Sequence, residues 1–284
     1  MTSDPAGFLA AYDALLDRWP VPVERLDLPS EYGTTRVLAC GPPDGEPLVL
    51  LHGGGSTAAV WFANAADLSR TRRVYAVDRI GEAGRSLCGE RRPRSVDALV
   101  DWLGGVLDDL DVGRADFCGH SYGGWLALTY ALRAPDRVRR LALLDPTQCF
   151  AGYRPRYLLH ALPLLLRPTA RRARAFLRWE TAGADLDPRW LDLYGRAAEL
   201  PDAKPVVGRR PTAGQLRACT TPTLVLLAGE SRAHDVGRVE AAARASLPLV
   251  GTAVLPGLTH HGMPYLGAAE LDRRVLDFLD ASQP

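Results

Sequence analysis

The feature that most constrains this chain is a serine placed between a predicted strand and a predicted helix. The pentapeptide GHSYG, centred on Ser121, follows the apolar run ADFC and precedes the helical run WLALTYALRA. A sharp turn here strains the backbone of the serine, and the flanking glycines let the strand and the helix approach closely. The hydroxyl is then exposed, and a nearby imidazole can deprotonate it to form a covalent acyl intermediate. We therefore predict that Ser121 is a nucleophile.

A glycine-rich loop upstream supplies candidate donors for the negative charge that such chemistry creates. The run PLVLLHGGGST ends a buried strand in three glycines, and neither a G-x-G-x-x-G pattern nor a P-loop lysine accompanies it, which disfavours a nucleotide site. The N–H groups of Gly54 and Tyr122 are the natural pair to hold the oxygen of a tetrahedral intermediate. We expect Gly53, Gly55 and Trp61 to contact the substrate.

The candidate base lies near the end of the chain. In the run AVLPGLTHHGMP, His260 follows the last predicted strand and precedes the last predicted helix. A loop at the carboxyl end of that strand can bring an imidazole to the serine turn from across a parallel sheet. We predict that His260 is the general base, with its neighbour His261 as the alternative. His52, before the glycines, and Asp78, at the end of another strand, are expected to brace loops.

Short apolar runs alternate with longer amphipathic stretches along most of the chain, which is typical of strand–helix repeats in a parallel sheet. The pattern predicts an α/β fold with an eight-stranded, mostly parallel sheet flanked by helices. The strands are expected near residues 21–28, 33–39, 47–52, 74–78, 115–119, 138–144, 222–228 and 251–255. After an N-terminal helix, the main helices are expected to begin at Thr57, Ser95, Tyr122, Asp235 and Gly267, with Ser95 and Asp235 as N-caps.

One interval breaks this alternation. Between the strands that end near residue 144 and begin near residue 222, only helical patterns follow one another. We therefore predict a core domain over residues 1–145 and 218–284 and an inserted helical cap over residues 146–217. The cap carries 13 Arg or Lys against 6 Asp or Glu, a bias explained by a solvated helical surface or by a substrate or carrier that is anionic.

The composition limits the partners. The 284 residues carry a formal net charge of +1, from 34 basic and 33 acidic side chains spread along the chain, so no global field attracts nucleic acid or a membrane. No apolar segment is long enough to span a bilayer, and the N-terminus lacks the pattern of a signal peptide. The five widely spaced cysteines include no C-x-x-C pair, which fits a reducing compartment. We expect a cytoplasmic protein that binds a small molecule and needs neither a metal nor another cofactor.

These motifs, in this order, resemble those of the α/β-hydrolase superfamily. The resemblance rests on LHGGG, the GHSYG turn, the strand end VYAVDRIGEAGRS and the PGxxH loop, and it covers nearly the whole chain. It implies the family's fold, a cap between strands six and seven, and an acyl-enzyme mechanism. Such a mechanism needs a carboxylate that orients the histidine.

That carboxylate is where this sequence departs from the family. In much of the family the acid follows strand seven in a Gly-x-x-Asp arrangement, whereas the sequence GESR occupies residues 229–232 here. Asp235 lies three residues further on, at the expected start of a helix, where it can also serve as an N-cap. Asp145 ends the sixth predicted strand, and some members of the family carry the acid there. Glu230 could supply the carboxylate only from an unusual register, and the sequence leaves the role open between Asp145 and Asp235.

The leading functional hypothesis is a serine hydrolase that cleaves an ester, a thioester or a related acyl bond. Serine as nucleophile disfavours the alkyl-enzyme chemistry of the family's dehalogenases and epoxide hydrolases, which use aspartate. Two alternatives remain: an acyltransferase or cyclase that uses the same residues in a dry pocket, and a non-catalytic protein that binds a small ligand on the same fold. The sequence indicates neither the physiological substrate nor the oligomeric state.

Overall fold

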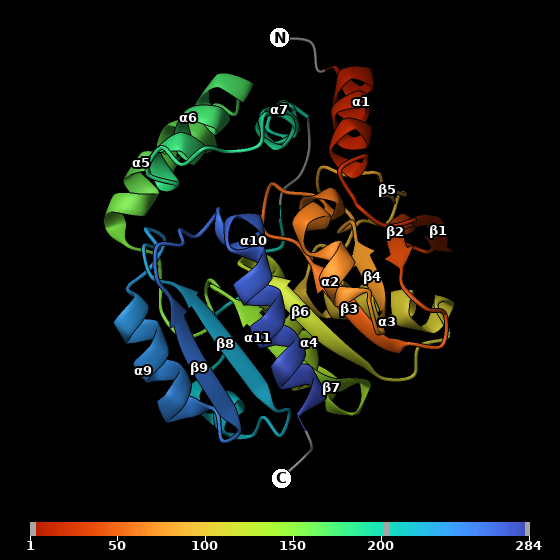
Figure 1. The fold of residues 1–284 in the computed structure, drawn as a ribbon, viewed down its shortest axis with the longest axis vertical. Helices are drawn as coiled ribbons and strands as arrows, with labels where there is room; N and C mark the ends of the chain where they lie inside the picture. Colours follow the sequence, from red (N-terminus) through yellow and green to blue (C-terminus); the bar gives the residue numbers. More distant parts are fainter. Residues whose placement is uncertain (1–3, 201–204, 282–284) are drawn as a thin grey trace.

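The computed structural model describes residues 4–200 and 205–281. Within them, the alternating pattern forms one sheet with helices on both faces (Figure 1). The nine strands of this part of the chain are β1 (Glu24–Ser30), β2 (Gly33–Cys40), β3 (Glu46–Leu51), β4 (Arg72–Val77), β5 (Leu87–Cys88), β6 (Ala115–His120), β7 (Val138–Leu144), β8 (Thr223–Ala228) and β9 (Val250–Leu255). All eight expected strands are present within a few residues of their expected positions.

The two-residue strand β5 is the difference from the expected eight. It pairs antiparallel with the start of β2, where Gly33 lies opposite Cys88 and Thr34 lies opposite Leu87. Two residues are too few to give an alternating apolar pattern, so the sequence carries no signal for this strand.

The strand order places the ends of several strands along one edge. The order is β1-β2-β4-β3-β6-β7-β8-β9, with β5 beside β2. β2 pairs antiparallel with β1 and β4, and every pairing from β4 through β3 to β9 is parallel. The sheet is therefore mostly parallel, as expected. The carboxyl ends of β3, β6, β7, β8 and β9 meet at the same edge, and the loops that follow them carry the candidate site.

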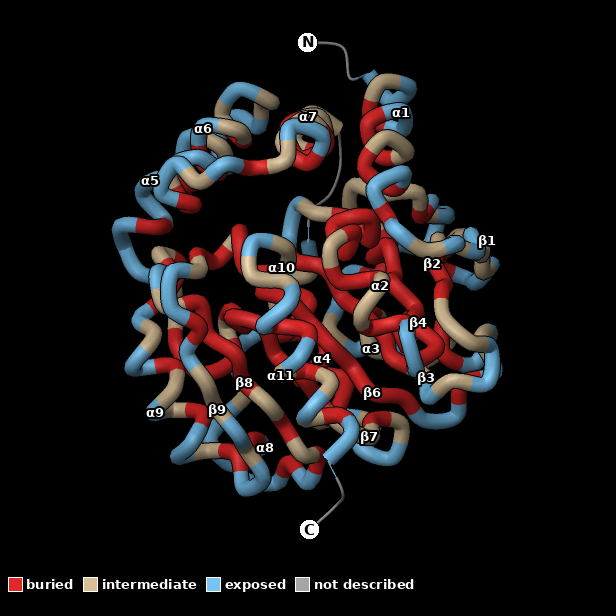
Figure 2. The backbone as a smooth tube through the Cα atoms, in the orientation of Figure 1, coloured by how far each residue is buried: buried red, intermediate tan, exposed pale blue. Residues whose placement is uncertain are grey.

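Helices cover both faces of the sheet. Outside the segment between β7 and β8, the helices are α1 (Pro5–Leu16), the 3₁₀ helix η1 (Ala58–Ala63), α2 (Ala65–Leu68), α3 (Val96–Asp109), α4 (Tyr122–Arg133), the 3₁₀ helix η2 (Pro135–Arg137), α9 (Val236–Ser246), α10 (Met263–Leu266) and α11 (Ala268–Asp280). Side chains of β3 alternate between two hydrophobic clusters. Leu48 and Leu50 belong to the cluster that includes residues of α1, η1, α2 and α11, whereas Val49 and Leu51 belong to the one that includes residues of α3, α4 and α9. Buried positions concentrate in the central strands (Figure 2).

The expected helix starts are confirmed, except that the helix after Thr57 is the 3₁₀ helix η1. The Ser95 hydroxyl accepts the Ala98 N–H over 3.1 Å and caps α3. The Asp235 carboxylate accepts the Arg238 N–H over 2.9 Å and caps α9. These short side chains satisfy amides that the first helical turn leaves without a partner.

The segment between β7 and β8 is helical, as expected. It contains α5 (Pro155–Leu166), α6 (Ala170–Glu180), α7 (Pro188–Ala197) and α8 (Ala213–Arg217). Figure 1 shows α5, α6 and α7 beyond one end of the sheet, with α1 beside α7. An ion pair between Arg196 and Asp4, and a hydrophobic cluster that includes Phe8 and Trp190, join α1 to α7. The N-terminal helix therefore packs against this helical segment, and the division into a core domain and a cap stays a prediction.

The cysteines behave as small apolar side chains. All five are free; four are buried, and Cys88 is partly exposed. Among the described residues, no helix combines the length and the apolar composition needed to cross a membrane.

Candidate active site

The serine turn has the strained geometry that its sequence predicts. Ser121 lies between β6 and α4 with φ 54° and ψ −116°, a conformation that residues other than glycine rarely adopt. Its N–H donates to the carbonyl oxygen of Leu144, at the end of β7, over 2.9 Å. The turn is thus held between two neighbouring strands.

Glycines on both sides of the serine allow this turn. A Cβ atom at Gly119 would lie 2.4 Å from the carbonyl oxygen of Gly123, and one at Gly123 would lie 2.1 Å from the carbonyl oxygen of Leu51. Both distances are shorter than any that real Cβ atoms show. Only glycine therefore lets β6, α4 and β3 approach as closely as they do.

Three loops bring Ser121, His260 and Asp145 into one hydrogen-bonded chain. His260 lies between β9 and α10; its Nε2 is 2.9 Å from Oγ of Ser121, and its Nδ1 is 2.6 Å from Oδ2 of Asp145. His260 is 1% exposed and Asp145 is 0% exposed. Because Nδ1–H donates to the carboxylate, the lone pair of Nε2 faces the serine hydroxyl and can accept its proton.

Asp145 is held by its backbone as well as by its side chain. It follows β7 with φ 42°, and its N–H donates to the carbonyl oxygen of Leu226 over 2.7 Å. Its Oδ1 accepts from the Ala228 N–H (3.1 Å) and from Nε2 of His234 (3.0 Å), and its Oδ2 accepts from the Ser231 hydroxyl (2.7 Å). These donors stabilise the ionised carboxylate.

Burial and charge act in opposite directions on the pKa values of this chain. Burial raises the pKa of Asp145, but the charges and hydrogen bonds of His234 and His260 outweigh it and hold that pKa well below its ordinary value. Burial lowers the pKa of His260, but Asp145 and then Glu180 raise it above its ordinary 6.5. The result is a carboxylate beside an imidazole that is held basic.

Asp235 lies elsewhere. Besides capping α9, its carboxylate is 3.4 Å from a guanidinium nitrogen of Arg154, and its side chain is 57% exposed. In the part of the chain that the structure describes, no hydrogen bond joins it to His260. The geometry therefore favours Asp145 over Asp235 as the acid that orients His260.

The glycine loop lies against the serine turn. A Cβ atom at Gly53 would lie 2.9 Å from Nδ1 of His120, and one at Gly54 would lie 4.0 Å from Cβ of Tyr122. Tyr122 is the first residue of α4, where an N–H has no partner within the helix. Gly54 thus lies next to Tyr122, the residue whose amide the sequence pairs with that of Gly54.

The other residues expected at the substrate differ in their placement. Gly55 has φ 71°, and a Cβ atom placed on it would lie 3.6 Å from the ring of Tyr194, which belongs to α7. Trp61 is 0% exposed and belongs to the core cluster that also contains Leu48. A side chain without accessible surface has none to offer a ligand, so the structure uses Trp61 for packing rather than for the expected substrate contact.

His52 and Asp78 brace the loops around the site, as expected. Nδ1 of His52 donates to the carbonyl oxygen of the next residue (2.9 Å), and Nε2 accepts the Arg79 N–H (3.1 Å), while burial lowers the pKa of this imidazole to about 3. The carboxylate of Asp78 accepts the N–H groups of Ala58 (2.7 Å) and Arg85 (2.8 Å). These bonds link the loops that follow β3 and β4.

Comparison with known proteins decides the family. Residues 48–274 match the model of the Alpha/beta hydrolase family. The chain belongs to this family. The match includes most of β3, every strand from β4 to β9 and all three residues of the hydrogen-bonded chain described above.

Two curated relatives in this family are carboxylesterases of Bacillus subtilis (strain 168). Carboxylesterase YbfK is 35% identical over 182 residues, which cover 64% of this chain and 60% of the relative. The uncharacterized carboxylesterase nap is 33% identical over 176 residues, which cover 61% of this chain and 56% of the relative. The aligned region therefore spans less than two thirds of the length of either relative.

Solved structures match almost the whole chain. The crystal structure of carboxylesterase CesB (YbfK) from Bacillus subtilis has a TM-score of 0.91 at 28% identity and covers 98% of this chain and 99% of that chain. The naproxen esterase (carboxylesterase NP) from Bacillus subtilis has a TM-score of 0.91 at 26% identity, with 99% and 100% covered. A 2-hydroxy-6-oxo-6-phenylhexa-2,4-dienoate hydrolase from a Rhodococcus species, at 20% identity and a TM-score of 0.74, shares the fold, with 92% and 100% covered.

The structure adds three residues that the sequence did not single out. Ser231 and His234, on the loop after β8, hydrogen-bond Asp145. Glu180, the last residue of α6, accepts the N–H of His260. The position of His234 just beyond a predicted buried strand was a usable signal, because polar residues at the carboxyl ends of parallel strands gather in the site. Glu180 lies in a charged amphipathic run, and such a run predicts an exposed helix.

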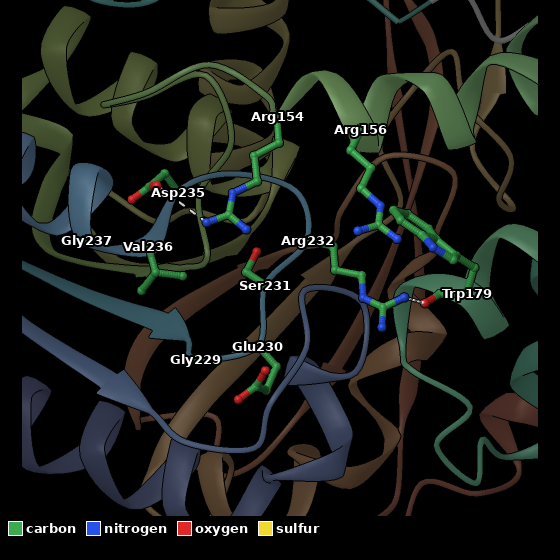
Figure 3. Close-up of a pocket in the computed structure, with 10 residues that line it drawn as sticks. All are labelled: Arg154, Arg156, Trp179, Gly229, Glu230, Ser231, Arg232, Asp235, Val236 and Gly237. Atoms are coloured by element: carbon green, nitrogen blue, oxygen red, sulfur yellow. Dashed lines mark hydrogen bonds and ion pairs between the residues drawn. The ribbon is translucent and has the colours of Figure 1, made fainter.

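A pocket of about 400 Å³ lies beside the loop that holds Asp145. It is lined by Arg154, Arg156, Trp179, Gly229, Glu230, Ser231, Arg232, Asp235, Val236 and Gly237. Figure 3 shows the guanidinium groups of Arg154, Arg156 and Arg232 gathered around it. Arg232 packs over the ring of Trp179, 5.1 Å from its centre. The pocket is thus mostly polar, with a guanidinium-rich wall.

Proposed function

We propose that this chain is a serine carboxylesterase that hydrolyses an ester of a small molecule through an acyl-enzyme on Ser121. The observation that carries the proposal is the buried chain of hydrogen bonds from Ser121 through His260 to Asp145, 2.9 Å and 2.6 Å long. A serine hydroxyl is a weak nucleophile until a base accepts its proton, and here a base and a group that orients it are both at hand. Family membership and two carboxylesterase relatives support the same chemistry.

The mechanism moves one proton back and forth. Oγ of Ser121 attacks the ester carbonyl carbon while Nε2 of His260 accepts the hydroxyl proton, and Asp145 stabilises the imidazolium. The carbonyl oxygen becomes an oxyanion that accepts from the N–H groups of Gly54 and Tyr122. Collapse of this intermediate breaks the bond to the alcohol oxygen, which takes the proton from the imidazolium. Water then attacks the acyl-enzyme by the same route and releases the acid.

Product analysis tests this proposal against its alternatives. The purified protein and its Ser121→Ala variant are incubated with p-nitrophenyl butyrate and with butyryl thioesters, with and without added methanol. We expect butyric acid as the main product, faster release from the oxyester than from the thioester, and no turnover by Ser121→Ala. Methyl butyrate as the main product would indicate acyl transfer instead. Binding of esters without turnover would indicate a ligand-binding protein.

The pocket of Figure 3 supports a narrower version of the proposal, in which the substrate is anionic or bound to an anionic carrier. Guanidinium groups such as those of Arg154, Arg156 and Arg232 bind carboxylate and phosphate oxygens in pairs. We expect an ester with a terminal carboxylate to have a higher kcat/KM than its neutral isostere, and Arg156→Gln to remove the difference. Arg171→Gln, near the start of the next helix α6, outside the pocket lining and also exposed, is the control. Equal kcat/KM values for the two esters in the wild type would refute this version.

A further inference from the structure

Glu180 is a buried carboxylate that the proposed mechanism does not use. It ends α6 and is 0% exposed. Its Oε1 accepts the His260 N–H over 3.2 Å, and its Oε2 accepts the His261 N–H over 2.9 Å. Next to Glu180 on α6, the carbonyl oxygen of Trp179 accepts from the guanidinium group of Arg232. The end of α6 therefore contacts two loops, one that carries the proposed base and one that holds the proposed acid.

A carboxylate in this place is costly in free energy. Burial disfavours its charged form, Asp145 adds a second negative charge nearby, and the carbonyl end of a helix repels an anion. A glutamine of the same size would avoid these costs, but it has one carbonyl oxygen and could not accept the two N–H groups on separate oxygens. What the carboxylate adds is this convergence of donors, together with a negative charge beside His260.

A second contact joins the helical segment to the same loop. The hydroxyl of Tyr157, on α5, lies 3.2 Å from Nε2 of His261. Tyr157 also packs with Phe176 of α6 and with Ala233 of the loop after β8. The helical segment thus contacts both loops, through hydrogen bonds at Glu180 and Tyr157 and through apolar packing at Tyr157.

We propose that Glu180 is a positioning residue that ties the end of α6 to the loops after β8 and β9 and so fixes the imidazole of His260 between Ser121 and Asp145. Glu180 acts through the backbone of His260 and touches neither Ser121 nor the substrate. The inference rests on the proposed serine mechanism. In this proposal, the position of the His260 imidazole depends on the position of α6.

The charge of Glu180 gives this role a signature that packing alone lacks. Burial lowers the pKa of His260, and the negative charges of Asp145 and Glu180 raise it. The titratable and charged groups that face Glu180 are His260 and His261 after β9, Arg232 after β8, Asp145 after β7, Tyr157 on α5 and Tyr194 on α7. Neutralising Glu180 removes one of the two negative charges that raise the pKa of His260 and therefore lowers that pKa.

Three variants test the role. Glu180→Gln leaves one carbonyl oxygen for two donors, and we expect kcat on p-nitrophenyl butyrate to fall about tenfold or more while KM changes by less than about twofold. The acidic limb of the pH profile of kcat/KM, where protonation of His260 lowers activity, should move to lower pH. Glu180→Asp keeps the charge but withdraws the oxygens, so kcat should fall with the limb near its wild-type position. Glu199→Gln, the matched control, removes another carboxylate of the helical segment that accepts a backbone N–H, that of Ala170 over 2.9 Å, and should change neither quantity.

The outcomes separate this inference from the mechanism on which it rests. If Glu180→Gln has the same kcat and the same acidic limb as Glu199→Gln, the inference is overturned and the serine mechanism stays intact. A fall in kcat without any shift of the acidic limb has the same consequence. Wild-type protein that a fluorophosphonate does not label at Ser121 would overturn both. Circular dichroism establishes that each variant is folded. If Glu180→Gln is unfolded, a folded Glu180→Asp with wild-type kcat would count against the inference.

Discussion

Replacing Asp145 with asparagine changes the charge of the hydrogen-bonded chain and keeps the size of the side chain. The carboxylate accepts from Nδ1 of His260 over 2.6 Å, whereas an asparagine amide turns a donor toward that nitrogen. His260 then carries its proton on Nε2, so that an N–H rather than a lone pair faces Ser121. An imidazole in this tautomer cannot accept the serine proton.

The expected loss is large because the pair is buried. Asp145 is 0% exposed and His260 is 1% exposed, so water cannot take the place of the carboxylate. We expect kcat/KM to fall about 10³–10⁴-fold, the size of the effect of a wrong tautomer in a Ser-His-Asp triad. This corresponds to about 4–5.5 kcal/mol of lost transition-state stabilisation. KM should change little, since Asp145 does not touch the substrate.

Hydrolysis of p-nitrophenyl butyrate at a pH above the acidic limb measures this loss, and circular dichroism shows whether the variant is folded. Asp235→Asn is the control, because Asp235 is exposed and asparagine is an equally good N-cap. Its kcat/KM should stay near the wild-type value. Wild-type activity in Asp145→Asn, or a comparable loss in Asp235→Asn, would refute the assignment of the acid.

Other predictions follow from the same geometry. Protonated imidazole cannot act as a base, so kcat/KM should fall as the pH decreases, with a midpoint above pH 6.5 because the pKa of His260 is raised; a midpoint well below that value would contradict it. Gly53→Ala places a Cβ atom 2.9 Å from Nδ1 of His120, whereas a Cβ atom at Gly105 would have no neighbouring atom within 4 Å. Gly53→Ala should therefore lower kcat/KM by about 10²-fold, and Gly105→Ala should not. Asp78→Ala leaves two buried N–H groups without an acceptor, and urea denaturation should show a loss of about 2–4 kcal/mol in the free energy of unfolding.

The fold was predictable because its signals are local. Strand and helix periods, and short polar residues such as Ser95 just before an apolar run, are written within a few consecutive residues. The strand β5 is too short to carry such a signal. The packing of α1 on α7 joins segments nearly two hundred residues apart, as in the pair of Asp4 with Arg196, and no local pattern encodes it.

Part of the candidate site was predictable for the same reason. The strained turn at Ser121 and the loop at His260 follow from motifs and from their order along a parallel sheet. The choice between Asp145 and Asp235 was open because both are carboxylates at the carboxyl end of a predicted strand or just beyond it. Their difference in burial, 0% exposed against a 57% exposed side chain, exists only in the folded chain. Glu180 is the harder case, since its helix carries an arginine-rich run and its carboxylate is buried by contacts far away in the sequence.

Covalent labelling of the nucleophile tests the proposed mechanism most directly. The folded wild-type protein and Ser121→Ala are treated with a fluorophosphonate probe, and the adduct is located by mass spectrometry. We predict a single adduct at Ser121 in the wild type and none in Ser121→Ala, because only a serine whose proton a base accepts reacts readily with this probe. A folded wild-type protein that stays unlabelled, or an adduct on another residue, would contradict Ser121 as the nucleophile.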